Sequence, residues 1–168
     1  MALTSTIELN VTGTQTNALD LGTALSPFSL SSLASLTSGT AAGMADRVFT
    51  DTRTLGASAT ENLDLAGVLT DAFGATITFV TIKAVIVRAA AANNVANPVQ
   101  VTRPASNGVP LFIAASDGIA LAPGYTFAWF GSGTGVTVTA ATGDIITVTN
   151  GAGTNSVNYD VIIIGTSA

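Results

Sequence analysis

Residues 77–88 read Ile-Thr-Phe-Val-Thr-Ile-Lys-Ala-Val-Ile-Val-Arg and form the strongest strand pattern in the chain. A nearly continuous apolar and β-branched run is typical of a strand that neighbouring elements cover on both faces. The longest apolar tract, residues 77–92, contains Lys83 and Arg88 and falls short of the roughly 18–20 residues that a membrane span needs. The sequence therefore predicts a central β-strand here and no transmembrane segment.

Short strands separated by turn residues are predicted on both sides of this central strand. Upstream, residues 47–55 alternate and are β-branched, and residues 59–65 place Leu63 and Leu65 on one face. Downstream strands are predicted at 99–102, 111–114, 119–121, 125–130, 136–140, 144–149 and 157–164, each after a turn signal such as Asn-Gly, Asp-Gly or Pro-Gly. This spacing predicts an all-β protein, an antiparallel β-sandwich that is jelly-roll-like if its strands divide into two sheets.

The N-terminal part is expected to differ from the rest within one domain, with residues 1–45 as a hairpin or arm plus linker and residues 46–168 as the sandwich body. In residues 3–11 the apolar side chains fall on odd positions, which places them on one face of a strand. Thr-Gly-Thr at 12–14 predicts a turn, after which residues 17–21 would pair back onto the first strand.

Two interpretations remain open for residues 23–45. Ser26-Pro27 could begin a short helix, with Phe28, Leu33 and Leu36 along one side. The density of Ser and Thr in this stretch favours an extended segment at least as much as a helix.

The composition excludes most catalytic chemistry. The 168 residues include no histidine and no cysteine, so Ser-His-Asp, Cys-His and histidine-containing zinc sites cannot form within one chain. The two glutamates, Glu8 and Glu61, have no aromatic cluster beside them that could bind a sugar ring, which argues against a glycosidase. We predict that the protein is not an enzyme and has no catalytic, cofactor-binding or metal-binding residues.

Two weaker site patterns are also compatible with ordinary structural roles. Asp64, Asp71 and Asp117 lie at predicted strand ends, where their carboxylates could converge on a calcium ion, but no EF-hand pattern is present. Gly-Ser-Gly-Thr-Gly at 131–135 has the glycine content of a phosphate loop. It lacks a following Lys-Ser/Thr and a helix, so a hairpin loop is predicted instead.

One predicted strand concentrates four of the ten aromatic residues. Tyr125, Phe127 and Trp129 share a face, which would be a carbohydrate platform if exposed and a core layer if buried. We expect burial, because a core of small residues needs a few large side chains to fill it. Phe130 points to the opposite face and is the candidate subunit-contact residue.

Charge and hydropathy bear on partners and location. The net charge is −5, and the five basic residues are scattered, so nucleic acid is not an expected partner. High apolarity with few charges predicts exposed apolar surface, and hence a homo-oligomer or a lattice component. The first eight residues lack the basic and apolar regions of a secretory signal, so synthesis in the cytoplasm is expected.

A set of short stretches over most of the chain carries a resemblance to a known group of proteins. They are Asp-Arg-Val-Phe-Thr-Asp-Thr-Arg-Thr-Leu at 46–55, Glu-Asn-Leu-Asp-Leu-Ala-Gly at 61–67, Leu-Thr-Asp-Ala-Phe-Gly at 69–74, Thr-Ile-Lys-Ala at 81–84, Ser-Asp-Gly-Ile at 116–119, Pro-Gly at 123–124, Thr-Gly-Asp at 142–144 and Tyr-Asp-Val-Ile-Ile-Ile-Gly at 159–165. Together they resemble small β-sandwich proteins encoded among the head and tail genes of tailed bacteriophages.

The resemblance implies a virion protein, made in the host cytoplasm and used in the particle. It implies a capsid decoration or cement protein that binds the major capsid protein, and it brings no catalytic residues. For the homo-oligomer expected from the composition, a trimer is favoured. Residues 1–22 could then be an arm that adds a strand to a neighbour, or could simply complete their own sandwich. The alternative function is a tail or fibre module that binds a carbohydrate receptor.

Overall fold

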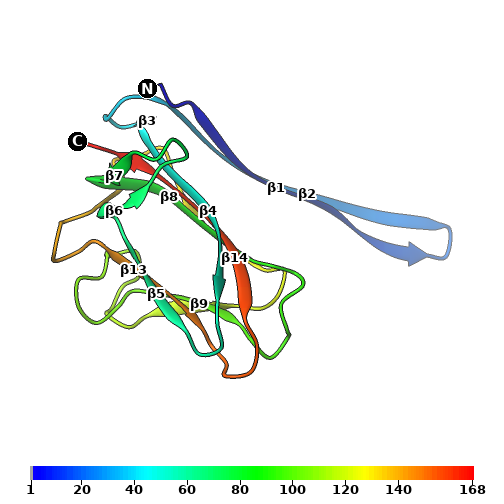
Figure 1. The fold of residues 1–168 in the computed structure, drawn as a ribbon. Coiled ribbons are helices and arrows are strands. Elements are labelled where there is room, and N and C mark those ends of the chain that lie inside the picture. Colours follow the sequence, from blue (N-terminus) through cyan, green and yellow to red (C-terminus); the bar gives the residue numbers. More distant parts are fainter. Residues whose placement is uncertain (1) are drawn as a thin grey trace.

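The computed structural model describes residues 2–168 and is an all-β protein, with no helix among these residues. Figure 1 shows a compact body and a long hairpin that projects from it. The hairpin consists of β1 (Ser5–Leu19) and β2 (Gly22–Ser38), and the short β3 (Met44–Ala45) joins it to the body. The expected division near residue 45 therefore coincides with a change in shape.

The body contains two main antiparallel sheets. The larger sheet has the order β11-β8-β14-β4, formed by β11 (Thr126–Phe130), β8 (Thr81–Ala89), β14 (Val157–Thr166) and β4 (Arg47–Leu55), with β12 (Val136–Thr137) also paired to β8. The smaller sheet has the order β10-β9-β13-β5, formed by β10 (Gly118–Leu121), β9 (Val99–Thr102), β13 (Ile145–Asn150) and β5 (Thr60–Asp64). A two-stranded sheet of β6 (Ala66–Thr70) and β7 (Thr76–Thr78) completes the body.

The eight strands that make up the two main sheets, with the short β12 set aside, pair in a nested order. The first, β4, pairs with the last, β14, and the second, β5, pairs with the seventh, β13. The third, β8, pairs with the sixth, β11, and the two middle strands, β9 and β10, pair with each other. The chain is therefore arranged as one long antiparallel hairpin that folds over to make two layers.

The main hydrophobic core contains residues from the facing sides of these two sheets. Alternate residues of β8 and β14 contribute one side, including Val85, Val87, Val161 and Ile163, each of them almost inaccessible to solvent. The smaller sheet contributes the other side through Leu63, Val99, Val101, Ile146 and Val148. Period-2 alternation in the strands thus produces the sandwich that the sequence predicts.

The predicted central strand is confirmed with one interruption. The pattern at 77–88 is divided between β7 and β8, because the chain leaves the small β6-β7 sheet before it enters the larger one. In β8, Val85 and Val87 face the main core, whereas Ala84 belongs to a second apolar cluster on the other face. The outer face of β8 is covered at Ala84 but open at Ile86, so coverage on both faces accounts for only part of the continuous apolar run.

Most other predicted strands are confirmed, and two predictions are wrong. The bounds of β4 and β9 coincide with the predicted ranges, whereas residues 111–114 form turns and bends and the strand predicted at 136–140 is only β12. Residues 111–114 are held as a loop because Arg103 Nη1 donates to the carbonyl oxygens of Phe112 and Ile113.

The N-terminal hairpin is longer than predicted. β1 continues through residues 12–14 without a turn, and its fifteen residues all pair with β2, so the turn lies at Asp20-Leu21. Pairing of residues 17–21 with residues 3–11 is therefore wrong, and so is the helix beginning at Ser26-Pro27. The glycine signal was misleading because Gly13 pairs with Phe28, whose ring covers the space that a side chain at Gly13 would occupy.

Candidate interaction surface

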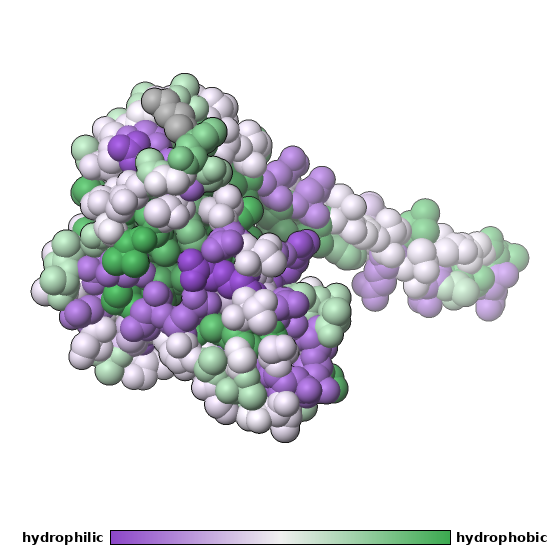
Figure 2. Space-filling model, in the orientation of Figure 1, coloured by the Kyte–Doolittle hydropathy of each residue, from purple (hydrophilic) through white to green (hydrophobic). Residues whose placement is uncertain are grey.

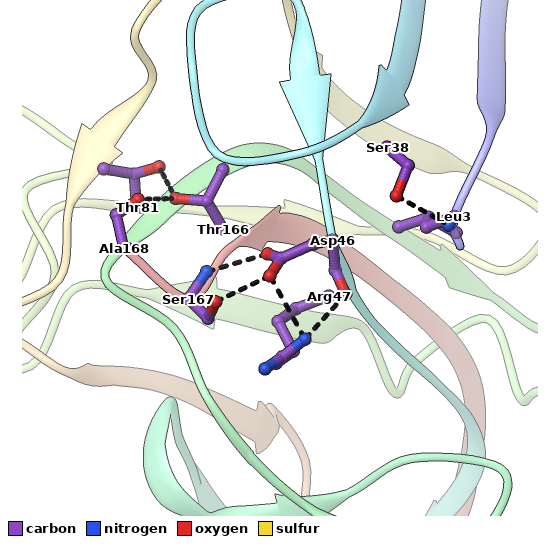
Figure 3. Close-up of polar contacts among 8 residues, drawn as sticks. All are labelled: Leu3, Ser38, Asp46, Arg47, Thr81, Thr166, Ser167 and Ala168. Atoms are coloured by element: carbon purple, nitrogen blue, oxygen red, sulfur yellow. Dashed lines mark hydrogen bonds and ion pairs between the residues drawn. The ribbon is translucent and has the colours of Figure 1, made fainter. Parts of the chain in front are cut away.

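The root of the hairpin is held to the body by polar contacts. Ser167 donates to Asp46 from both its backbone nitrogen, at 2.8 Å, and its hydroxyl, at 2.6 Å. Arg47 Nη1 approaches the same carboxylate at 3.2 Å, and Thr81 and Thr166 share a hydrogen bond beside it (Figure 3). The C-terminus and the start of β4 are therefore joined where the hairpin leaves the body.

Further contacts connect the hairpin itself to this root. β3 pairs with the end of β2 in parallel, and the backbone nitrogen of Gly43 donates to the carbonyl of Ser132 at 2.8 Å. The backbone nitrogen of Leu3 donates to the hydroxyl of Ser38 at 3.4 Å. Gly43 thus attaches the segment after β2 to the body, and the Leu3–Ser38 bond joins the two hairpin strands where β1 begins and β2 ends.

A second apolar cluster lies under the root. Its buried members are Leu36, Ala45, Ala84 and Ile164, and Leu3, Ile7, Val48 and Phe130 pack against it. Val48, Ala84, Phe130 and Ile164 all come from the outer face of the larger sheet, the face away from the main core. The hairpin therefore packs its first apolar residues against the outer face of its own sheet.

The apolar face of the hairpin continues beyond this contact into solvent. Directly paired residues in an antiparallel ribbon share a face, so Leu9, Val11, Phe28 and Leu30 lie on the same side as Ile7 and Leu36. Their exposed fractions are 47%, 43%, 57% and 62%. We call these four residues the distal stripe.

The opposite face of the hairpin is mostly polar. Its residues include Thr6, Glu8, Asn10, Thr12, Thr14 and Thr16 on β1, and Ser29, Ser31 and Ser35 on β2. Leu25 and Leu33 are exposed exceptions on this face. The hairpin is thus an amphipathic ribbon, and Figure 2 shows apolar and polar residues along the length of the arm.

An isolated two-stranded ribbon of this length is not expected to remain uncovered. Two-stranded hairpins are marginally stable in water, and a fully buried Leu, Val or Phe contributes about 1.5–3 kcal/mol relative to an exposed one. Half of the sixteen large hydrophobic side chains that are exposed among residues 2–168 lie on this hairpin or its turn. The ribbon therefore has the character of a docking element.

A shallow groove occupies the outer face of the larger sheet, next to the root cluster. It encloses about 610 Å³, and its apolar lining includes Ile86 and Ile162. Ala128 pairs with Ile86, and Thr50 pairs with Ile162, so these four residues form the row after Phe130, Ala84, Ile164 and Val48. The larger sheet thus also has an uncovered apolar row beside a covered one.

Beyond this row the groove becomes polar. Arg88 Nη2 donates to Asp160 at 2.6 Å, and the Thr52 hydroxyl donates to the same carboxylate at 2.7 Å. The hydrogen bond from Thr52, followed by that from Arg88, lowers the pKa of Asp160. The charges in this part of the groove therefore already have partners.

The three aspartates considered for calcium each stabilise a separate loop. Asp64 accepts from the backbone nitrogen of Ala66, Asp117 accepts from that of Ala114, and Asp71 accepts from those of Phe73 and Ala75. No group of three potential acidic ligands comes together among residues 2–168. Their positions at strand ends reflect turn formation, in which Asp side chains bind nearby backbone nitrogens.

The glycine-rich residues 131–135 form the loop between β11 and β12. The Lys83 ammonium lies beneath it and donates to the carbonyl oxygens of Gly133, at 2.7 Å, and Thr134, at 2.6 Å. Burial lowers the pKa of Lys83. The loop therefore directs carbonyl oxygens inward to a cation, which is the opposite of a phosphate-binding arrangement.

The aromatic strand is only partly as predicted. Phe127 and Trp129 pack against the main core, and Phe127 stacks on Phe112 with ring centroids 5.8 Å apart. Tyr125 lies just before β11 and is 66% exposed, so the prediction that it is buried is wrong. Phe130 faces outward as predicted and covers the root cluster of its own chain.

Glu61 belongs to a polar network between β4, β5 and β14. Its carboxylate accepts a hydrogen bond from Arg53 at 2.5 Å and from the Tyr159 hydroxyl at 2.7 Å. Burial, followed by the hydrogen bond to Glu61, raises the pKa of Tyr159. Glu8 lies on the distant hairpin, so the two glutamates do not form a pair.

Comparison of the chain with protein-family models, with curated proteins and with solved structures finds no match in any of the three. No helix among residues 2–168 has the length and apolarity required to cross a membrane. The candidate site therefore rests on the geometry of the hairpin and the larger sheet.

The sequence pattern predicted the apolar positions of β1 but not the places of Phe28 and Leu30 on the same face. The signal for these two residues was the alternation of apolar side chains at residues 28, 30, 34 and 36.

Proposed function

We propose that the protein is a structural component of a bacteriophage virion, a capsid decoration or cement protein that binds the major capsid protein lattice. The observation that carries this proposal is the amphipathic hairpin, which is fixed at its root and exposes the distal stripe. Such an element suits repeated docking on neighbouring subunits. Many copies around symmetry axes would convert weak individual contacts into strong overall attachment.

We also infer that the body is a jelly roll. When the eight strands of the two main sheets, with β12 set aside, are numbered from 1 to 8 in chain order, the sheets have the orders 6-3-8-1 and 5-4-7-2. Nested pairing of the first strand with the last, and so on inward, folds one hairpin into two four-stranded layers, which is the jelly-roll arrangement of viral capsid and lectin domains. The fold is compatible with a virion role but does not specify it.

The proposal includes a homo-oligomer, with a trimer favoured, located in the virion. The support is the same exposed apolar surface, because a chain with few charges and a long apolar stripe gains stability when copies cover it. The polar networks described above also have internal structural roles, which agrees with a function other than catalysis. Neither nucleic acid nor membrane is proposed as a partner.

A tail or fibre module that binds a carbohydrate receptor is the second candidate. The observation in its favour is the exposed ring of Tyr125, since aromatic rings can stack on sugars. Trp129, however, packs against the main core, which leaves Tyr125 without a second exposed aromatic residue on that strand. Shielding of Trp129 from an added fluorescence quencher in the assembled protein would favour the structural role.

Sedimentation with phage capsids tests the proposed function. Purified protein is mixed with capsids that lack it, and the pellet is analysed for both proteins. Co-sedimentation at a fixed ratio to the major capsid protein is the expected result. Absence of binding to capsids, together with a stable oligomer in isolation, would contradict the decoration role and favour the tail or fibre candidate.

A further inference from the structure

We propose that the distal stripe of one copy packs into the groove on the outer face of the larger sheet of a second copy. The contact would be made by Leu9, Val11, Phe28 and Leu30 of the hairpin with the row that contains Ile86 and Ile162. This inference specifies the partner and geometry of self-association. It rests on the hairpin and the sheet and would hold for any location of the protein.

The structure already contains an intramolecular example of this contact. Ile7 and Leu36, on the apolar face of the hairpin, belong to the cluster that covers Ala84 and Ile164 on the outer face of the sheet. The distal stripe is the continuation of the first surface, and the groove is the continuation of the second. The apolar face of the hairpin and the outer face of the larger sheet thus pack together at the root, and both are uncovered in the residues that follow the root cluster.

The chemistry of the two surfaces is complementary. The distal stripe contains no charged residue, and Glu8 lies on the other face of the hairpin. The groove offers Ile86 and Ile162 for apolar contact, and its charged residues all have partners, since Arg88 pairs with Asp160 and Asp51 pairs with Arg53. Docking would therefore leave no charge newly buried without a partner, which is the usual penalty at interfaces.

A second copy is the occupant because a hairpin cannot return to its own groove. The arm projects away from the body beyond the root, as Figures 1 and 2 show. Its first strand of fifteen residues spans roughly 50 Å at about 3.3 Å per residue, which is long enough to reach a neighbouring molecule. Each copy offers one arm and one groove, so the contact would give a reciprocal dimer, a closed ring or an open filament, depending on the rotation between copies.

Docking by the face of the hairpin is favoured over addition of a strand at its edge. Pro27 lies within β2 and has no backbone N–H to donate to a further strand. The apolar side chains, in contrast, are gathered on one face along both strands. The exposed surface that requires burial is therefore the face.

The test compares two leucines on opposite faces of the same strand in the full chain. Leu30 belongs to the distal stripe and is 62% exposed, whereas Leu33 lies on the polar face and is 61% exposed, so Leu33→Glu is a matched control for Leu30→Glu. Sedimentation equilibrium should show an oligomer for the original protein and for Leu33→Glu. Leu30→Glu should weaken association about 30-fold or more.

A second variant tests the identity of the groove. In the double variant Leu30→Glu with Ile162→Lys, opposite charges would face each other in every contact, so association should recover relative to Leu30→Glu alone. Circular dichroism confirms folding of each variant.

Three outcomes would overturn the inference. The first is an original protein that remains monomeric even at high concentration. The second is an equal loss of association in Leu30→Glu and Leu33→Glu. The third is a double variant that associates no more strongly than Leu30→Glu alone. A monomer that loses capsid binding only with Leu30→Glu would overturn this inference and the proposed homo-oligomer, while supporting the capsid decoration role.

Discussion

The Tyr159 hydroxyl is the residue-scale feature with the clearest pH dependence. Because burial and Glu61 raise the pKa of Tyr159, the folded protein keeps this proton at pH values where the unfolded chain, with a tyrosine pKa near 10, loses it. The contribution of the protonated Tyr159 hydroxyl to the unfolding free energy is therefore fully present below about pH 10. Above that pH it decreases by up to about 1.4 kcal/mol per pH unit.

Tyr159→Phe separates this effect from the titration of other groups. The variant should lose about 0.5–2 kcal/mol of unfolding free energy at neutral pH, because the hydrogen bond to Glu61 is removed. Above pH 10 its unfolding free energy should decrease less steeply than that of the original protein. Urea denaturation at a series of pH values measures both, and parallel curves above pH 10 would contradict the role assigned to Tyr159.

Lys83 provides a second prediction at this scale. Its ammonium holds the carbonyl oxygens of Gly133 and Thr134, so Lys83→Met should leave two loop acceptors without a donor and cost about 1–3 kcal/mol. Residues 131–135 should also exchange their amide hydrogens faster. Arg103→Met, which affects a different loop, should leave amide exchange at 131–135 unchanged. If residues 131–135 of Lys83→Met exchanged their amide hydrogens as slowly as in the original protein, Lys83 would not be what holds this loop.

At the scale of elements, the hairpin is expected to be dispensable for folding of the body. The main core contains no residue of β1 or β2, and the root cluster needs only their first and last residues. Joining Ile7 to Ala34, which are paired, through Asn-Gly would remove the distal arm and keep the root.

This shortened protein should unfold at nearly the same temperature as the full chain when both are monomeric, as measured by circular dichroism. Its solubility should also increase, because the distal stripe is absent. A chain that fails to fold, or that melts far below the full protein, would show that the distal arm supports the body.

The elements also show what the sequence could and could not predict. Strands with period-2 alternation, such as β4 and β9, were located correctly because alternation follows directly from burial of one face. The length of the hairpin was underestimated because Gly13 is a turn signal only in the absence of a cross-strand partner. Pairing with Phe28, fifteen residues away in the sequence, cannot be inferred from local pattern.

The candidate interaction surface was likewise predictable only where it follows from local alternation. Alternation identified the apolar face of residues 3–11, but the outward exposure of that face depends on how the root attaches to the body. That attachment uses Asp46 and Ser167, which are distant in the sequence and have no recognisable motif. The groove likewise combines residues from β4, β8, β11 and β14, and only the sheet order brings them together.

At the scale of the whole molecule, the nested strands form the buried core, whereas the projecting hairpin exposes apolar surface. The nested strands enclose the main apolar core within one chain, whereas the distal stripe of the hairpin and the groove on the outer face of the larger sheet are uncovered. The molecule thus combines a body that has its own core with two uncovered surfaces suited to assembly, which is the basis of the proposed virion role.

Capsid co-sedimentation of the full chain and of the protein with the shortened arm tests that combination most directly. The full chain should pellet with capsids that lack it, at a fixed ratio to the major capsid protein. The shortened protein, although folded, should bind at least about tenfold more weakly, because copies that no longer associate through the distal stripe lose the strength of multivalent attachment. Equal binding of both proteins, or binding of neither, would contradict the account.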